Sequence, residues 1–369
     1  MFKKTLVAAS VLSALACSAA VAADVTLYGV IDTSLVFTAV DAKNGAGRTN
    51  KFEMSSGEEW GSRWGIRGVE DLGSGYSVGF DLQSGIRSDN GTAQYDRIFA
   101  REASIHVKGP FGKLTMGRMD ALIGTRTSAG RMQVINAWGD GYGPYNPCIQ
   151  NVMSEYGYLD NAVFYESPSL SGLTLRVQYS MGPDGVENKS NNTSTATANR
   201  YAAATAMYEN GPLTLVLGAD RVFYGHAAGE DADDSLTVTL GGKYDLGFMR
   251  LHAGVQYFDE VLTTTFRGFS WDDVPAKMKG FGSSVSAGIP LAGGNLMLGV
   301  SYLDAEAADS VKSDVDVKRI VGGVGYQFPL SKRTHLYCAA SAGQDEVKTA
   351  TTKIKPNYYK AIAGIRHLF

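Results

Sequence analysis

Cysteine is scarce in this chain of 369 residues, which contains Cys17, Cys148 and Cys338 and no others. So few cysteines exclude a disulfide-stapled scaffold, although they leave open one bond between Cys148 and Cys338. Basic residues do not predominate either, because the formal net charge is −3, and this argues against a nucleic-acid partner. After the N-terminal segment no apolar run reaches the roughly 18 residues that a transmembrane helix needs.

The N-terminus has the pattern of a secretory signal peptide, which we place at residues 1–23. Two lysines precede the apolar stretch Leu6–Ala16, and Val21–Ala23 supplies small residues for cleavage. Lipidation at Cys17 is a weaker alternative, because the aliphatic residue usual three positions earlier is missing. The sequence therefore predicts an exported protein with one mature domain, residues 24–369.

Glycine and tyrosine are abundant, with 44 and 19 copies, and they suit short strands, tight turns and interfacial aromatics. The last segment, Asn357–Phe369, alternates in character and ends on an aromatic residue. The same period of two recurs in segments such as Leu173–Met181 and Ser235–Asp245. Each has one apolar and one polar face, which predicts β-strands.

The spacing of these segments distinguishes a barrel from a sandwich. Short connections, for example Gly109–Gly112 and Glu209–Pro212, alternate with longer polar ones such as Ser88–Ala100 and Gly182–Asn199. Seven short turns and eight long loops define sixteen strands, with both termini on the short-turn side. We therefore predict an all-β fold, a closed sixteen-stranded antiparallel transmembrane β-barrel.

Five motifs occur in order along the mature chain: Val25–Gly29, Ser62–Gly73, Gly109–Arg118, Asn161–Pro168 and Gly364–Phe369. With them the chain resembles the Gram-negative general porins, especially the branch of Neisseria and related β-proteobacteria. That resemblance implies a homotrimer in the outer membrane, in contact with lipid and lipopolysaccharide. It also implies passive diffusion of small hydrophilic solutes through a lumen that an infolded third external loop narrows.

The residues locate this third loop independently of the resemblance. Met119–Tyr158 is the longest interval between predicted strands, and it is rich in glycine and aromatic residues, as in Trp138–Asn146. A loop of this length without regular structure is usually functional or disordered, and its aromatics argue against disorder. We expect it to form the constriction; an extracellular flap is the alternative.

A pore of this kind selects solutes by fixed charges at its narrowest point rather than by catalytic groups. The resemblance places wall arginines at Arg63 and Arg118, although Arg118 reaches the lumen only if the strand bulges after Gly117. In two places, Val30 and Tyr158, the chain lacks a cation found in relatives. The remaining candidate lining residues are Arg67, Arg87, Asp120, Arg126, Arg131, Asp140 and Glu155, with Asp140 the preferred acid.

From this mixture of charges we expect weak selectivity with a slight anion preference. Phe369 is the predicted signal for membrane assembly. No cofactor or metal site is expected, because the histidines lie on separate strands without ligand spacing. Two other functions compete with a channel: a barrel enzyme, for which no nucleophile motif is present, and an adhesin whose long loops bind host ligands. The preferred solute and the pore radius do not follow from the sequence.

Overall fold

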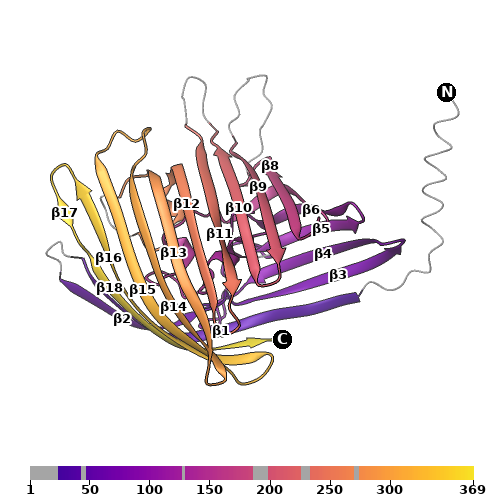
Figure 1. Ribbon diagram of the computed structural model, residues 1–369, viewed down its shortest axis with the longest axis horizontal. Coiled ribbons are helices and arrows are strands. Elements are labelled where there is room, and N and C mark those ends of the chain that lie inside the picture. Colours follow the sequence, from indigo (N-terminus) through magenta and orange to yellow (C-terminus); the bar gives the residue numbers. More distant parts are fainter. Residues whose placement is uncertain (1–23, 43–46, 127–128, 186–197, 226–232, 270–273) are drawn as a thin grey trace.

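The computed structural model describes residues 24–42, 47–126, 129–185, 198–225, 233–269 and 274–369. The predicted signal peptide, residues 1–23, lies outside these ranges. Within them β-strands are the main regular structure, together with three short 3-10 helices, and none of the helices is long and apolar enough to cross a membrane. Figure 1 shows the strands side by side around one wall, with β1 (indigo) and the last strands (yellow) returning to the same edge.

The eighteen assigned strands form sixteen wall positions, as predicted. β2 and β3 pair with successive parts of β1, and β17 and β18 both pair with β16, so each of these two pairs is one interrupted wall strand. The strands are β1 (Asp24–Asp41), β2 (Arg48–Ser56), β3 (Arg63–Gly73), β4 (Tyr76–Gly85), β5 (Glu102–Gly109), β6 (Gly112–Asp120), β7 (Tyr158–Glu166), β8 (Leu173–Ser180), β9 (Arg200–Asn210), β10 (Leu213–Phe223), β11 (Ser235–Asp245), β12 (Arg250–Leu262), β13 (Lys277–Leu291), β14 (Gly294–Ala307), β15 (Val315–Pro329), β16 (Thr334–Thr349), β17 (Lys353–Ile354) and β18 (Asn357–Leu368). The 3-10 helices are η1 (Met132–Ile135), η2 (Ile149–Asn151) and η3 (Thr263–Thr265).

The barrel closes between its two ends. β1 and β18 are antiparallel neighbours, with Val30 opposite Leu368 and Asp41 opposite Asn357. The backbones of Gly29 and Phe369 then exchange two hydrogen bonds, of 3.0 and 3.1 Å. The prediction of a closing strand that ends at Phe369 is therefore confirmed. That Phe369 is needed for assembly stays a prediction.

Burial is inverted relative to a water-soluble protein. On β11 the apolar face, Leu236 and Leu240, is 39% and 52% exposed, whereas the polar face, Thr237 and Thr239, is 3% and 0% exposed. An apolar outer face is what lipid stabilises, and polar groups inside must find partners. The interior is filled because the connection between β6 and β7, residues 121–157, turns inward. We call this connection loop 3.

Candidate functional site

Loop 3 is hydrogen-bonded to the lumen face of the wall opposite the strands that flank it. The amide of Asn136 donates to Ser284 on β13 over 2.6 Å, and the backbone N–H of Ala137 donates to Ser286 over 2.8 Å. Further along the loop, Ser341 on β16 donates to the carbonyl of Tyr145 over 2.6 Å. Because serine is short, these bonds bring the loop backbone close to the wall.

An apolar side of loop 3 packs against the same wall, where glycines leave room for it. Ile135 is fully buried, and a Cβ atom on Gly254 would lie 2.7 Å from its side chain. A Cβ on Gly282 would lie 1.7 Å from the carbonyl oxygen of Val152. Six neighbouring strands carry inward-facing glycines at which an added Cβ atom would contact loop 3. These glycines are Gly218, Gly241, Gly254, Gly282, Gly299, Gly323 and Gly325.

On the other side of the lumen, arginines from the wall and one arginine of loop 3, Arg126, surround one tyrosine. The guanidinium carbons of Arg101, Arg118 and Arg126 lie 5.6, 5.4 and 5.4 Å from the ring centre of Tyr158. Arg63 stands next to them, since it donates to the carbonyl of Gly61 over 2.8 Å and lies within electrostatic range of Arg101. We call Arg63, Arg101, Arg118 and Arg126 the arginine cluster.

The predicted bulge after Gly117 is confirmed, and it turns Arg118 toward this cluster. The pairing of β6 with β7 shifts between Gly117 and Met119. Gly117 has φ +129°, and a Cβ there would lie 2.2 Å from the carbonyl oxygen of Ala103, so only glycine fits.

Members of the arginine cluster differ in how their charge is balanced. Arg118 forms an ion pair with Asp160 over 2.6 Å, and Arg126 pairs with Glu155 over 3.2 Å. In the described part of the chain, Arg63 and Arg101 form no ion pair; Arg101 instead donates to the amide oxygen of Gln83 over 2.8 Å. Both are largely covered, with exposures of 9% and 5%, so their charges are poorly screened.

The predicted acidic residues have different environments. Asp120 is 0% exposed and accepts the backbone N–H of Arg126, and Glu155 is 6% exposed and bonded to Thr125. Both therefore hold the loop together instead of presenting a carboxylate to the open lumen. Asp140 differs, since it lines a cavity and lies within electrostatic range of Arg101, Arg126 and, across the lumen, Arg63.

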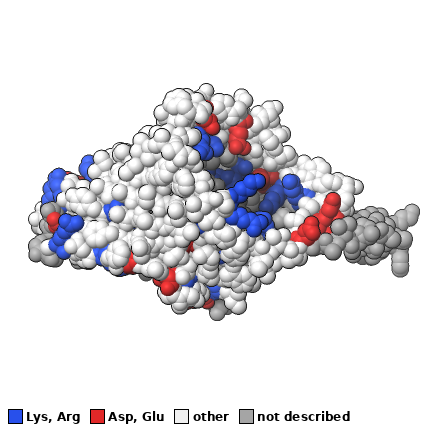
Figure 2. All heavy atoms as spheres, turned by 90° about the horizontal axis from the view of Figure 1, so that it is seen from below, with Lys and Arg blue, Asp and Glu red and all other residues white. Residues whose placement is uncertain are grey.

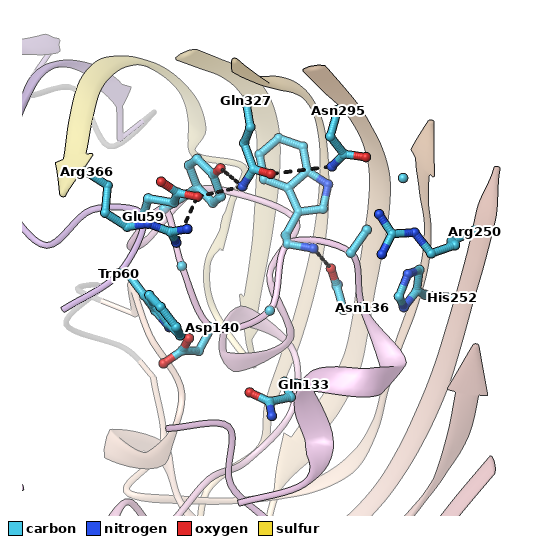
Figure 3. Close-up of a pocket in the computed structure, with 16 residues that line it drawn as sticks. Glu59, Trp60, Gln133, Asn136, Asp140, Arg250, His252, Asn295, Gln327 and Arg366 are labelled. Atoms are coloured by element: carbon cyan, nitrogen blue, oxygen red, sulfur yellow. Dashed lines mark hydrogen bonds and ion pairs between the residues drawn. The ribbon is translucent and has the colours of Figure 1, made fainter. Parts of the chain in front are cut away.

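That cavity, about 300 Å³ in volume, lies beside the tip of loop 3 (Figure 3). Asp140 and Trp60 point into it from one side, and Arg250 and His252 of β12 from the other. Arg366 of β18 also lines it; its guanidinium lies 4.6 Å from the Trp60 ring centre and pairs with Glu59 over 3.3 Å. Burial raises the pKa of Asp140, and the positive charge of Arg267 acts against that shift.

The other predicted lining residues lie apart from the arginine cluster. Arg67 is exposed on β3, 4.9 Å from the Tyr28 ring centre, and Arg87 is exposed in the connection after β4. Arg131 is directed toward β7 and β8, where it shares Glu166 with Arg176. Of the nine predicted lining residues, then, Arg63, Arg118, Arg126 and Asp140 are brought together around the lumen, and Asp120 and Glu155 lie against Arg126.

Sequence reasoning missed several basic residues of the lumen, among them Arg101, Arg250 and Arg366. Arg101 precedes β5 and lies outside any motif, so the sequence offered only one indication of its role, a charged residue directly before a strand. Arg250 and Arg366 occupy inward positions of their strands, where a charged residue in an alternating segment could have indicated the lumen side. Figure 2, looking onto one end, shows basic side chains gathered in and around the hollow.

Among the described residues, no group of three or more His, Cys, Asp or Glu side chains could hold a metal ion. Cys148 and Cys338 are both free, the first buried in loop 3 and the second exposed. The bond between them that the sequence left open is therefore not formed.

Comparisons with known proteins agree on one family. A family model described as Gram-negative porin matches residues 8–349. An outer membrane porin of Bordetella pertussis is 31% identical over the full length of both chains, and the major outer membrane protein P.IB of Neisseria meningitidis is 28% identical, also over both full lengths. Among solved structures, an anion-selective porin from Comamonas acidovorans shares the fold, with a TM-score of 0.68, 23% identity and coverage of 94% of this chain and 100% of that one.

Proposed function

The chain belongs to the Gram-negative porin family and is an outer-membrane channel for passive diffusion rather than an enzyme; we propose that its constriction, between the tip of loop 3 at Asp140 and the arginine cluster, favours anions weakly. The observation that carries this proposal is the imbalance of charge across the lumen. Arg63 and Arg101 form no ion pair in the described part of the chain, and Asp140 is the acid that faces them.

The physical basis is the electric field between fixed charges on the two sides of a narrow passage. Two uncompensated cations on the wall and one carboxylate on the loop set a transverse field with a small positive excess. Glu155 and Asp160 do not reverse that excess, because each is engaged by an arginine within 3.2 Å. Small hydrophilic solutes of either sign pass, and anions are favoured slightly. The name of the solved Comamonas protein, an anion-selective porin, is in keeping with this sign.

For assembly we propose a homotrimer surrounded by lipid and lipopolysaccharide. We also propose that residues 1–23 are a signal peptide that directs export and is then cleaved. The family supports this, and so does an apolar groove on the outer face, where Leu35, Met54, Leu336 and Ile365 line a cavity of about 510 Å³. Unheated detergent samples should migrate on gels at about three times the monomer mass and collapse on boiling. Migration as a monomer under all conditions would refute the trimer.

Selectivity is tested in a planar bilayer under a salt gradient. Arg63→Glu should move the zero-current potential toward cations by roughly several millivolts in a gradient of about tenfold, because charges at a constriction are poorly screened. Asp140→Asn should move it toward anions. Arg87→Glu, an exposed loop arginine away from the cluster, is the matched control and should have little effect. Unchanged potentials in both Arg63→Glu and Asp140→Asn would place the narrowest point elsewhere.

A further inference from the structure

A second loop covers the part of loop 3 that follows its tip. This is the connection after β12, of which residues 263–269 and 274–276 are described; we call residues 263–269 the loop 6 segment. The backbone N–H of Arg267 donates to the carbonyl of Gln150 over 2.8 Å, and the hydroxyls of Ser154 and Thr265 are 2.8 Å apart. Loop 3 is thus held between the barrel wall and the loop 6 segment.

Both loops are fastened to the wall by one arginine. Arg319 on β15 stands directly opposite Asp345 on β16, and it donates to both carboxylate oxygens over 2.7 Å. Its other N–H groups donate to backbone carbonyls: Asn151 of loop 3 over 3.1 Å, and Arg267 and Gly268 of the loop 6 segment over 2.7 and 2.8 Å. All five N–H donors of the guanidinium are therefore used.

Stability alone does not account for this arrangement. Arg319 and Asp345 are 1% and 0% exposed, and a buried ion pair is no more stabilising than well-packed apolar residues of similar size. What apolar side chains cannot supply is three hydrogen bonds that fix the positions of two loop backbones. The Phe269 ring, 3.9 Å from the guanidinium carbon, further limits the movement of the arginine.

The loop 6 segment in turn contacts the acid of the constriction. The guanidinium of Arg267 donates to the backbone carbonyl of Asp140 over 2.7 Å. Arg267 is also the leading charged partner of the Asp140 carboxylate. A continuous series of bonds therefore runs from Asp345 through Arg319 and Arg267 to Asp140.

We propose that Arg319 and Asp345 are positioning residues of the channel, and that Arg267 determines specificity by fixing the place and the effective charge of Asp140. This inference rests on the proposed constriction. The width of the proposed constriction is then set by two loops, and the loop 6 segment contributes a cation, Arg267, that offsets the charge of Asp140 on loop 3.

Arg267→Gln tests the electrostatic part. Removing the cation leaves Asp140 less compensated, so the reversal potential should shift toward cations. If Arg267 acts through Asp140, the shift should be smaller in an Asp140→Asn background, where the carboxylate is already gone. An equal shift in both backgrounds, or no shift in either, would overturn this role.

The positioning role is tested with Arg319→Met combined with Asp345→Leu, which replaces the buried pair without leaving a lone charge. Channels that assemble should show higher single-channel conductance and more current noise, because loop 3 is held less firmly. The matched control is Lys318→Met with Asp304→Leu, which removes an exposed ion pair of 2.9 Å at the adjacent position of β15. It should conduct as the original protein does.

Arg319→Lys tests the same role if the double variant does not assemble. It keeps a cation beside Asp345 but has three donors instead of five, so it should raise the noise in the same way. Original conductance and noise in whichever of these variants assembles would refute the positioning role. If Arg63→Glu and Asp140→Asn shift the potential in parallel recordings while the Arg319 variants change nothing, this inference alone fails. If those two also change nothing, the proposed constriction itself fails.

Discussion

The two sides of the lumen are built on different principles. On β10–β15 the inward face carries small residues, with glycines such as Gly254 and Gly282 against which loop 3 packs and short hydroxyl side chains such as Ser284 to which it bonds. On β3–β6 the inward face carries large cations, and Arg63 and Arg101 face loop 3 across the lumen. One side is a close-packed interface, and the other is a charged surface.

The two sides of the lumen therefore have different roles in the channel. Packing density on the first side decides where loop 3 lies, because a close-packed interface tolerates little displacement. In the constriction that we propose, charge on the second side decides which ions pass, because Arg63 and Arg101 form no ion pair in the described part of the chain. Substitutions on the first side should therefore change stability and conductance, whereas those on the second should change selectivity with the fold intact.

The largest effect is expected at Gly282. In Gly282→Ala the new Cβ would lie 1.7 Å from the carbonyl oxygen of Val152, so loop 3 has to move. We expect a loss of about 1–3 kcal/mol, typical of overpacking, together with altered conductance. Thermal unfolding of the detergent-solubilised protein and single-channel recording measure the two effects.

Gly288→Ala on the same strand is the control for Gly282→Ala. Its Cβ would meet nothing closer than 3.4 Å, so stability and conductance should stay unchanged. Equal effects of the two substitutions would mean that the first side of the lumen does not hold the loop by packing.

A smaller effect separates paired from unpaired arginines. Arg101→Gln removes a cation without an ion-pair partner in the described structure, whereas Arg118→Gln also releases Asp160, which keeps its bond to Arg97 over 2.6 Å. Arg101→Gln should therefore shift the reversal potential toward cations without loosening the β6–β7 region, and Arg118→Gln should lower thermal stability as well. A loss of thermal stability in Arg101→Gln but not in Arg118→Gln would contradict the assignment of Arg118 as the stabilising, ion-paired arginine.

The smallest effect is expected from pH. Because burial raises the pKa of Asp140, its carboxylate should take up a proton at higher pH than exposed carboxylates do. The carboxylate of Asp140 then loses its negative charge as pH falls, so anion preference should increase at a pH above that at which exposed acids titrate. Reversal potentials measured over a series of pH values should show this step, and Asp140→Asn should abolish it.

The sequence was sufficient for the fold because the strand signal is periodic and local. Leu236 and Thr237 alternate whether or not their neighbours are known, and the turn spacing adds the strand count. Even the bulge after Gly117 could be predicted, since Arg118 would otherwise face lipid. These features depend on residues adjacent in the chain.

The site was less accessible because it depends on contacts between distant residues. Asp120 and Glu155 looked like lining acids, but their carboxylates bond within loop 3. Arg101 gave no pattern, since its importance comes from standing beside Gly61 and Tyr158 in space. The glycines of β10–β15 were counted in the composition, yet their shared inward direction appears only once the strands are aligned.

One contact of loop 3 bears on the order of assembly. Lys360, on the closing strand β18, donates to the carbonyl of Tyr142 over 2.9 Å and to Glu58 over 2.8 Å. These bonds cannot form before the last wall strand is in place beside β16 and β1. A barrel that is still open at its seam therefore lacks part of what fixes its bore, and the final diameter of the channel is reached only in the step that also seals it.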